Sequence, residues 1–180
     1  MFTIPGFPLL RLTLIALLFA VQACSPTYNW REVSSTDAAF SALFPAKPAT
    51  HSRSINLDGI QVTMTMTAAE IDGVTFAIGS AQLSDPATVL PALNAMKTAL
   101  TRNINGTVRR EKSSASAANP IPSTEIEAIG APAAGGGQPM LLMARFAAKN
   151  QRIYQVVVVG REQAVSREAA ETFLTSFKLD

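Results

Sequence analysis

Cys24 is the residue of this sequence best placed to do chemistry, because it is the only cysteine among the 180 residues and closely follows an apolar run. The run, residues 12–20, is too short to span a bilayer, which needs about 20 apolar residues. It has the length of the hydrophobic region of a secretory signal peptide, with Arg11 before it and small residues after it. The pattern therefore predicts an export signal that ends beside a single thiol.

The sequence Val-Gln-Ala-Cys at positions 21–24 resembles the lipobox of bacterial lipoprotein signal peptides. The resemblance implies that residues 1–23 are removed by cleavage after Ala23, and that the Cys24 thiol carries a diacylglyceryl group. Ser25, rather than aspartate, follows the cysteine. By the sorting rule of Gram-negative relatives, this implies the outer membrane, with the protein facing the periplasm. The alternatives are an ordinary signal peptide with a chance cysteine and an uncleaved amino-terminal anchor.

The composition bounds what the remaining chain can do. Removal of residues 1–23 would leave 157 residues (180 − 23), with 14 basic and 13 acidic side chains and a net charge of +1. That length suffices for one domain with a substantial core. The near-neutral balance argues against a nucleic-acid partner, which needs a clustered basic surface. With no second cysteine, the mature chain has no internal disulfide and no cysteine-based metal site.

Residues 24–36 are polar and precede the first apolar pattern, so we expect a lipid-anchored tether followed by one domain at 37–180. Trp30, the only tryptophan, is expected to dock onto that domain, since a large ring gains more from burial in protein. A position at the membrane interface is the alternative.

Alternating apolar residues predict strands in the first half of the domain. In residues 60–68 the even positions are apolar and the odd ones polar, the period of a strand with one buried face. Asp58-Gly59 and Asp72-Gly73 flank this strand as tight-turn dipeptides, and residues 74–83 return as its partner. Residues 39–45 alternate as well, although their alanines keep a helical turn open.

The second half is predicted to hold two helices and several further strands. Asp85 is expected to begin a helix and Gly106 to end it, with Leu90 in its apolar stripe, and Ser166 to cap the closing helix. We expect strands at residues 107–116, 123–129, 140–147 and 153–159. Four consecutive valines, 156–159, leave no polar face, so their strand is expected to be central and covered on both sides. These elements predict an α+β fold, with a mostly antiparallel twisted sheet covered by helices.

The order of elements resembles bacterial proteins with a PsbP-like α/β/α sandwich, many of them lipoproteins. The resemblance rests on residues 40–48, the hairpin from 144 to 156 and the closing helix at 173–179. It implies a binding or assembly subunit rather than an enzyme. No site motif carries over residue by residue.

Two features typical of enzymes have simpler interpretations here. His51, the only histidine, lies in a polar stretch and has no Gly-x-Ser-x-Gly motif to accompany it, so surface placement is favoured over catalysis. Gly135-Gly136-Gly137 lacks the lysine and hydroxyl residue of a phosphate-binding loop, which favours a flexible loop. We therefore expect no catalytic residues and no cofactor.

Methionines and charged clusters are the remaining candidates. Met64 and Met66 share a strand face, and a thioether pair can bind copper(I), but packing in the core is the favoured interpretation. Glu125 and Glu127 share a strand face and are expected to be solvated, because no acid–base partner is evident. The charged run at residues 109–112 is interpreted as a protected sheet edge, with a docking edge as the alternative.

These features together predict a lipid-anchored cell-envelope protein that binds or supports another envelope protein and is not an enzyme. The alternative is a periplasmic binder of a small apolar or metal cargo, held between sheet and helix by the methionines. The two hypotheses differ in a structural requirement: cargo needs a sizeable internal pocket, whereas a protein partner needs an exposed apolar patch.

Overall fold

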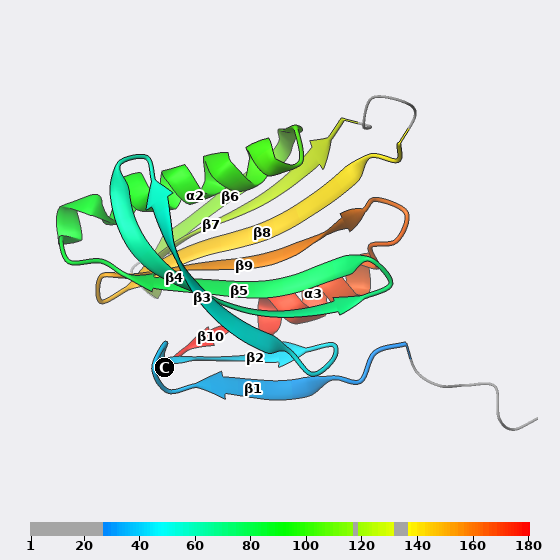
Figure 1. Ribbon diagram of the computed structural model, residues 1–180, viewed down its shortest axis with the longest axis horizontal. Helices are drawn as coiled ribbons and strands as arrows, with labels where there is room; N and C mark the ends of the chain where they lie inside the picture. The colour runs from blue at the N-terminus through cyan, green and yellow to red at the C-terminus, as the bar shows by residue number, and fades with distance from the viewer. Residues whose placement is uncertain (1–26, 117–118, 132–136) are drawn as a thin grey trace, which may run out of the picture.

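The computed structural model describes residues 27–116, 119–131 and 137–180 (Figure 1). The expected signal peptide, its cleavage site at Ala23, the lipidation site Cys24 and residues 135–136 of the glycine run lie outside the described residues.

Two antiparallel sheets form the framework. The larger has seven strands in the order β3-β4-β5-β9-β8-β7-β6, and the smaller has three in the order β1-β2-β10. The strands of the larger sheet are β3 (Ala49–Leu57), β4 (Ile60–Ile71), β5 (Val74–Gln82), β6 (Gly106–Ser116), β7 (Asn119–Gly130), β8 (Met140–Lys149) and β9 (Arg152–Arg161). Those of the smaller sheet are β1 (Arg31–Ser35), β2 (Phe40–Phe44) and β10 (Lys178–Leu179).

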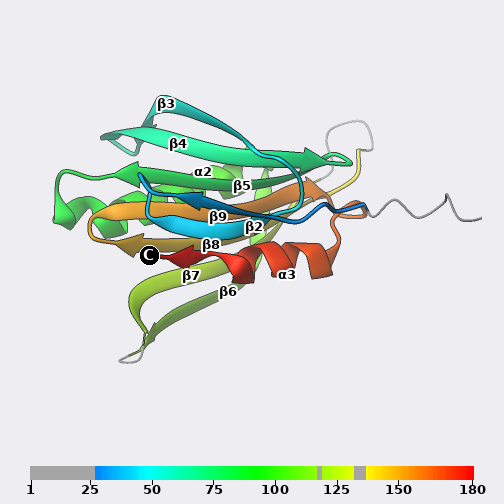
Figure 2. The ribbon, with the colours of Figure 1, turned by 90° about the horizontal axis from the view of Figure 1, so that it is seen from below.

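The helices lie on opposite faces of the larger sheet (Figures 1 and 2). A short 3₁₀ turn, η1 (Pro86–Thr88), leads into α2 (Val89–Asn103), which buries Ala92 and Met96 in one core. On the other face, α3 (Arg167–Ser176) and the small sheet enclose a second core around Phe173. The expected α+β class with a mostly antiparallel sheet is confirmed.

The valine run occupies the middle strand of the larger sheet, as expected. Val156 and Val158 belong to the core beneath α3, and Val157 belongs to the core beneath α2. All three are at most 3 % exposed. A run without polar residues is stable here because successive side chains of a strand point to opposite faces, and both faces are covered.

The predicted tight turns are present, and their backbone explains the residues used. Asp58, Gly59, Asp72 and Gly73 all have positive φ, the conformation of a two-residue hairpin turn. Asp85 accepts a hydrogen bond from the Ala87 N–H at 2.8 Å and so begins the 3₁₀ turn as expected.

Asn105, not Gly106, adopts the left-handed conformation after α2, so the predicted end of that helix is wrong in detail. Gly106 is the first residue of β6. It is needed there because an added Cβ would lie 2.7 Å from the Ile104 side chain.

Regular secondary structure begins before residue 37, where we expected the domain to start. Residues 31–35, expected to belong to the tether, form β1 and pair with β2 along their whole length. The predicted docking of Trp30 is confirmed, because Trp30 and Tyr28 pack partly buried against the core beneath α3. The Tyr154 hydroxyl also donates a hydrogen bond to the Ala38 carbonyl at 2.8 Å, and burial raises the pKa of this phenol.

Strand β3 was not predicted, and β7 is longer than expected. Residues 49–54 of β3 are exposed, and all but Ala49 are polar, so no alternation signals a strand; pairing with β4 along nine residues holds it. β7 begins at Asn119 rather than at residue 123, because it continues its pairing with β6. The expected alternation in β4 is present, but Thr67 on its polar face is buried.

Candidate functional site

The residues suggested for metal or catalytic chemistry do not form a common site. His51 is exposed on the edge strand β3. Met64 is 2 % exposed within the core beneath α2, which confirms the packing interpretation, and the Met66 sulfur accepts a hydrogen bond from Gln155 Nε2 at 3.5 Å. Within the described part of the chain, no three His, Cys, Asp or Glu side chains gather closely enough to hold a metal ion.

The two charged clusters of the sequence meet on the α3 side of the larger sheet. The register places Arg110 opposite Glu127 and Lys112 opposite Glu125. These residues line a groove of about 280 Å³ beside α3, where β6 and β7 curve away from the helix (Figure 2). The sequence shows both clusters, but only strand pairing brings them together.

Glu127 is bound to α3 by a bidentate contact. Arg167 Nη1 donates to its Oε2 at 3.0 Å, and Arg167 Nη2 donates to its Oε1 at 2.9 Å. These hydrogen bonds lower the pKa of the Glu127 carboxyl below its ordinary value of 4.5; partial burial opposes the effect, and the charges of Arg167, Arg110 and Arg109 add to it. The pair connects the curved strand β7 to the first turn of α3.

Two weaker contacts complete this network. Arg109 Nη1 lies 4.0 Å from Glu162, and Arg145 Nε lies 4.0 Å from Glu125. Arg145 Nε is buried and has no hydrogen-bond partner among the described residues. Most of the charges on this side of the sheet are therefore close to an opposite charge within the domain, and a structural role accounts for them.

Replacing Arg167 with alanine is expected to raise the pKa of Glu127 toward its ordinary value. The lowered folded-state pKa means that the pair stabilises the fold above about pH 4.5, and that this contribution is lost as the pH falls through the folded pKa. Because Arg167 is 54 % exposed, the loss at pH 7 should stay below about 1 kcal/mol. A carbon NMR titration of Glu127 and urea unfolding at pH 7 and pH 3 test this, with Arg161→Ala as the control. An unchanged Glu127 titration would contradict it.

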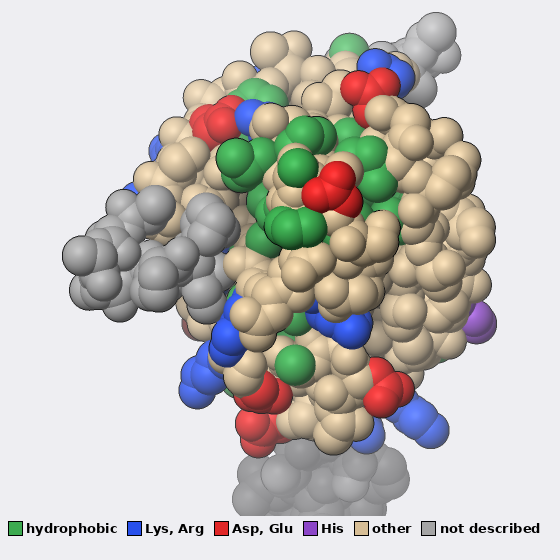
Figure 3. Space-filling view, turned by 90° about the vertical axis from the view of Figure 1, so that its left-hand side faces the viewer, with side chains coloured by type: hydrophobic (Ala, Val, Ile, Leu, Met, Phe, Trp, Pro, Cys, Tyr) green, Lys and Arg blue, Asp and Glu red, His purple; other side chains and the backbone are tan. Residues whose placement is uncertain are grey.

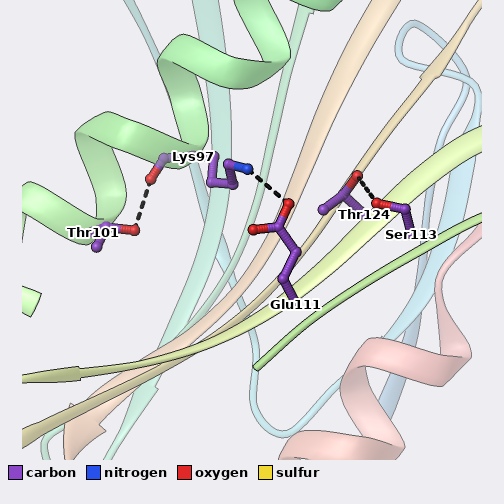
Figure 4. Close-up of polar contacts among 5 residues, drawn as sticks. All are labelled: Lys97, Thr101, Glu111, Ser113 and Thr124. Carbon is purple, nitrogen blue, oxygen red and sulfur yellow. Dashed lines mark hydrogen bonds and ion pairs between the residues drawn. The ribbon is translucent and has the colours of Figure 1, made fainter. Parts of the chain in front are cut away.

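The charged run of β6 is shared between the two faces of the sheet, and Glu111 faces α2 (Figure 4). Lys97 Nζ donates to Glu111 Oε1 at 2.8 Å, and the Thr101 hydroxyl donates to the Lys97 carbonyl at 2.9 Å. Ser113 and Thr124 join β6 to β7 through their hydroxyls at 3.3 Å. The β6 edge is therefore connected to α2 by an ion pair and to β7 by hydroxyl groups, consistent with the interpretation as a protected edge.

A second groove, of about 450 Å³, separates α2 from the β3–β4 turn; we call it the α2 groove. The helix contributes residues spaced along one side, and the turn contributes residues held by a hydrogen bond from Gly59 N–H to Asn56 Oδ1. The lining consists of Asn56, Leu57, Asp58, Ile60, Pro91, Asn94, Ala95, Thr98, Ala99 and Arg102. Small side chains at the helix surface thus leave room for a neighbouring element.

Leu90, at the start of α2, was expected to be part of the core, and that prediction is wrong. Its side chain is 63 % exposed, and among the described residues it is the only large hydrophobic residue so exposed. Ala92 and Met96 face the sheet instead, which leaves Leu90 on the solvent side of the helix, directly before the groove residue Pro91. Figure 3 shows hydrophobic side chains gathered on this end of the molecule.

No protein-family model and no curated protein matches the chain. Among solved structures, the cyanobacterial PsbP protein CyanoP from Synechocystis sp. PCC 6803 has a TM-score of 0.59 and 9 % identity, and the match covers 89 % of this chain and 99 % of that one. At this identity the similarity shows the fold alone, so the chain has a PsbP-like fold.

Two further structures are less similar. The Saccharomyces cerevisiae Ran-binding protein Mog1p has a TM-score of 0.49 and 9 % identity, over 84 % of this chain and 96 % of that one. PA94, a protein of unknown function from Pseudomonas aeruginosa, has a TM-score of 0.39 and 7 % identity, over 75 % and 85 %. Neither supports a conclusion about this chain.

Neither helix in the described part of the chain has the length and apolar content needed to cross a bilayer.

Proposed function

We propose that this chain is a lipid-anchored protein of the bacterial cell envelope that binds another envelope protein and is not an enzyme. The anchor is a diacylglyceryl group on Cys24, and the PsbP-like domain faces the periplasm from the outer membrane. The observation that carries the binding role is the exposed Leu90, which directly precedes Pro91 of the α2 groove.

An exposed leucine next to a groove supports a protein partner for a physical reason. Large apolar side chains that become buried in a pocket supply much of the binding energy at protein interfaces. Leu90 can insert into a partner, while the α2 groove accepts an apolar side chain of that partner over Ala95 and Ala99. Asp58 and Arg102, which also line the groove, supply the polar contacts that fix orientation.

The cargo alternative has less support. The core between α2 and the sheet is filled by buried side chains, including Met64, Met96 and Phe146. Their packing leaves the methionine face of β4 without the internal space that a cargo between sheet and helix requires.

The proposal is tested by crosslinking in cells, followed by affinity recovery of the tagged full-length chain and mass spectrometry. We expect one envelope protein in near-stoichiometric amount with the parent chain, and at least about fivefold less with Leu90→Asp or Ala99→Arg, because each disrupts the apolar contact. Cys24→Ser should lose both the partner and incorporation of a radioactive fatty acid.

Charge reversal at Arg109 and Arg110 is the matched control, and recovery of the partner should be unchanged. Recovery of the chain alone would refute protein binding. If only the charge reversal abolished recovery of the partner, the docking site would be the β6 edge and not the α2 groove. A fatty-acid label that survives in Cys24→Ser would refute the anchor independently of the partner.

A further inference from the structure

The two edges of the seven-stranded sheet differ in how well they are protected against pairing with another strand. On β6, irregularities interrupt the pairing at Val108/Arg110 and Ser114/Ser116, and residues 109–112 carry four charges. Bulges and charges are the usual protection of an exposed edge. On β3, nine residues pair with β4 without interruption, no proline occurs, and Arg53 is the only Lys, Arg, Asp or Glu residue.

β3 is also uncovered. Residues 49–54 are all exposed, and Figure 2 shows β3 at the outer edge of the sheet, with no described element beyond it. A regular and uncovered edge with a single charged residue is a template for adding another strand.

The two-residue turn at Asp58-Gly59 determines which backbone groups face outward. Such a turn makes Leu57 and Ile60 a hydrogen-bonded pair, so alternate residues of β3 bond to β4 and those between them do not. The side chains agree, because the Thr50–Thr67 and Ser52–Thr65 hydroxyls meet at 3.0 and 2.8 Å, as in the closer non-bonded pairs. The free N–H and C=O groups at this edge are therefore those of Thr50, Ser52, Ser54 and Asn56.

We propose that β3 pairs antiparallel with β3 of a second copy of this chain, around a two-fold axis at Ser52. In this register Ser52 faces Ser52 of the partner subunit, and Thr50 faces Ser54 of the partner subunit. Each pair exchanges two backbone hydrogen bonds, and the two sheets become continuous. The inference goes beyond the proposed function and does not depend on it.

Self-pairing is favoured over an unrelated strand because β3 is self-complementary. The register at Ser52 places Arg53 opposite His51 of the partner subunit, whereas a shift by one residue at the axis would place the two Arg53 side chains opposite each other. It also sets a row of hydroxyl residues against an identical row, the kind of pairing that β3 already makes with β4. Because a strand edge is a small interface, we expect a dimer dissociation constant in the micromolar range.

The test is the mass of the full-length chain, extracted in mild detergent, measured by sedimentation equilibrium over a range of concentrations. We expect two copies at high concentration. Ser52→Pro should weaken association by at least about tenfold, because it removes an outward N–H in each copy and leaves the backbone hydrogen bonds to β4 intact. Ser52→Lys, which protects the edge by its charge, should weaken association by a similar factor. It provides a second test if the proline variant fails to fold.

A crosslink establishes the register. In a Cys24→Ser background, Ser52→Cys should join two copies with a short thiol-specific crosslinker, and Lys112→Cys on β6 should not. One copy at all concentrations, or association that neither Ser52→Pro nor Ser52→Lys weakens, would overturn the proposal. An association that persists while Ser52→Cys fails to crosslink would overturn the register.

Discussion

Replacing Phe173 with alanine is expected to lower the free energy of unfolding by about 3–5 kcal/mol, the range for removing a fully buried phenylalanine. The Phe173 side chain is 0 % exposed. Its ring packs edge-on against Phe44 at 5.1 Å and Phe76 at 5.5 Å between centroids, so it joins α3 to both sheets. Truncation leaves a cavity bordered by two strands and a helix that are each held by other contacts, and such a site collapses only in part.

The measurement is urea unfolding followed by the fluorescence of Trp30, the only tryptophan, which packs partly buried against the same core. Leu90→Ala is the control, and its effect should stay within about 0.5 kcal/mol because Leu90 is 63 % exposed. A loss below about 1 kcal/mol for Phe173→Ala would contradict the packing described for α3.

Replacing Gly130 with alanine is expected to cost about 3 kcal/mol, at the upper end of overpacking effects. An added Cβ would fall against the backbone carbonyl oxygen of Ile104, which follows the end of α2. Backbone at that point is fixed by the pairing of Gly106 with Gly130, so the clash is relieved only by separating α2 from β7. Urea unfolding measures the loss.

Gly79→Ala is the matched control, because it inserts the same methyl group into a different environment. At Gly79 the added atom would lie 2.6 Å from the Met66 sulfur and 2.8 Å from Gln155 Cγ. Both belong to flexible side chains that can turn aside, so we expect about 1 kcal/mol. Equal losses at the two glycines would show that the backbone at Ile104 moves more freely than the structure indicates.

The sequence predicts those local features that depend on a few neighbouring residues. The Asp-Gly turns, the cap at Ser166, the charged edge at β6 and the central valine strand all follow from backbone conformation, capping or burial of consecutive residues. β3 was missed because its stability comes from its neighbour and not from its own pattern.

The candidate site was harder to predict from the sequence. Leu90 has the spacing of a core residue, and only the rotation of α2 about its axis, set by Ala92 and Met96 against the sheet, places it in solvent. The α2 groove likewise depends on where the β3–β4 turn lies relative to the helix. Neither orientation is encoded by local periodicity.

By itself, the sequence determined the α+β composition, the resemblance of residues 21–24 to a lipobox, and most of the strands and turns, because these depend on residues close together in the chain. Only the tertiary structure decided that Arg167 binds Glu127, that Leu90 is exposed and that β3 forms an unprotected edge. Each of these depends on contacts between distant segments, which form when the two cores exclude water from the central strands of the sheet.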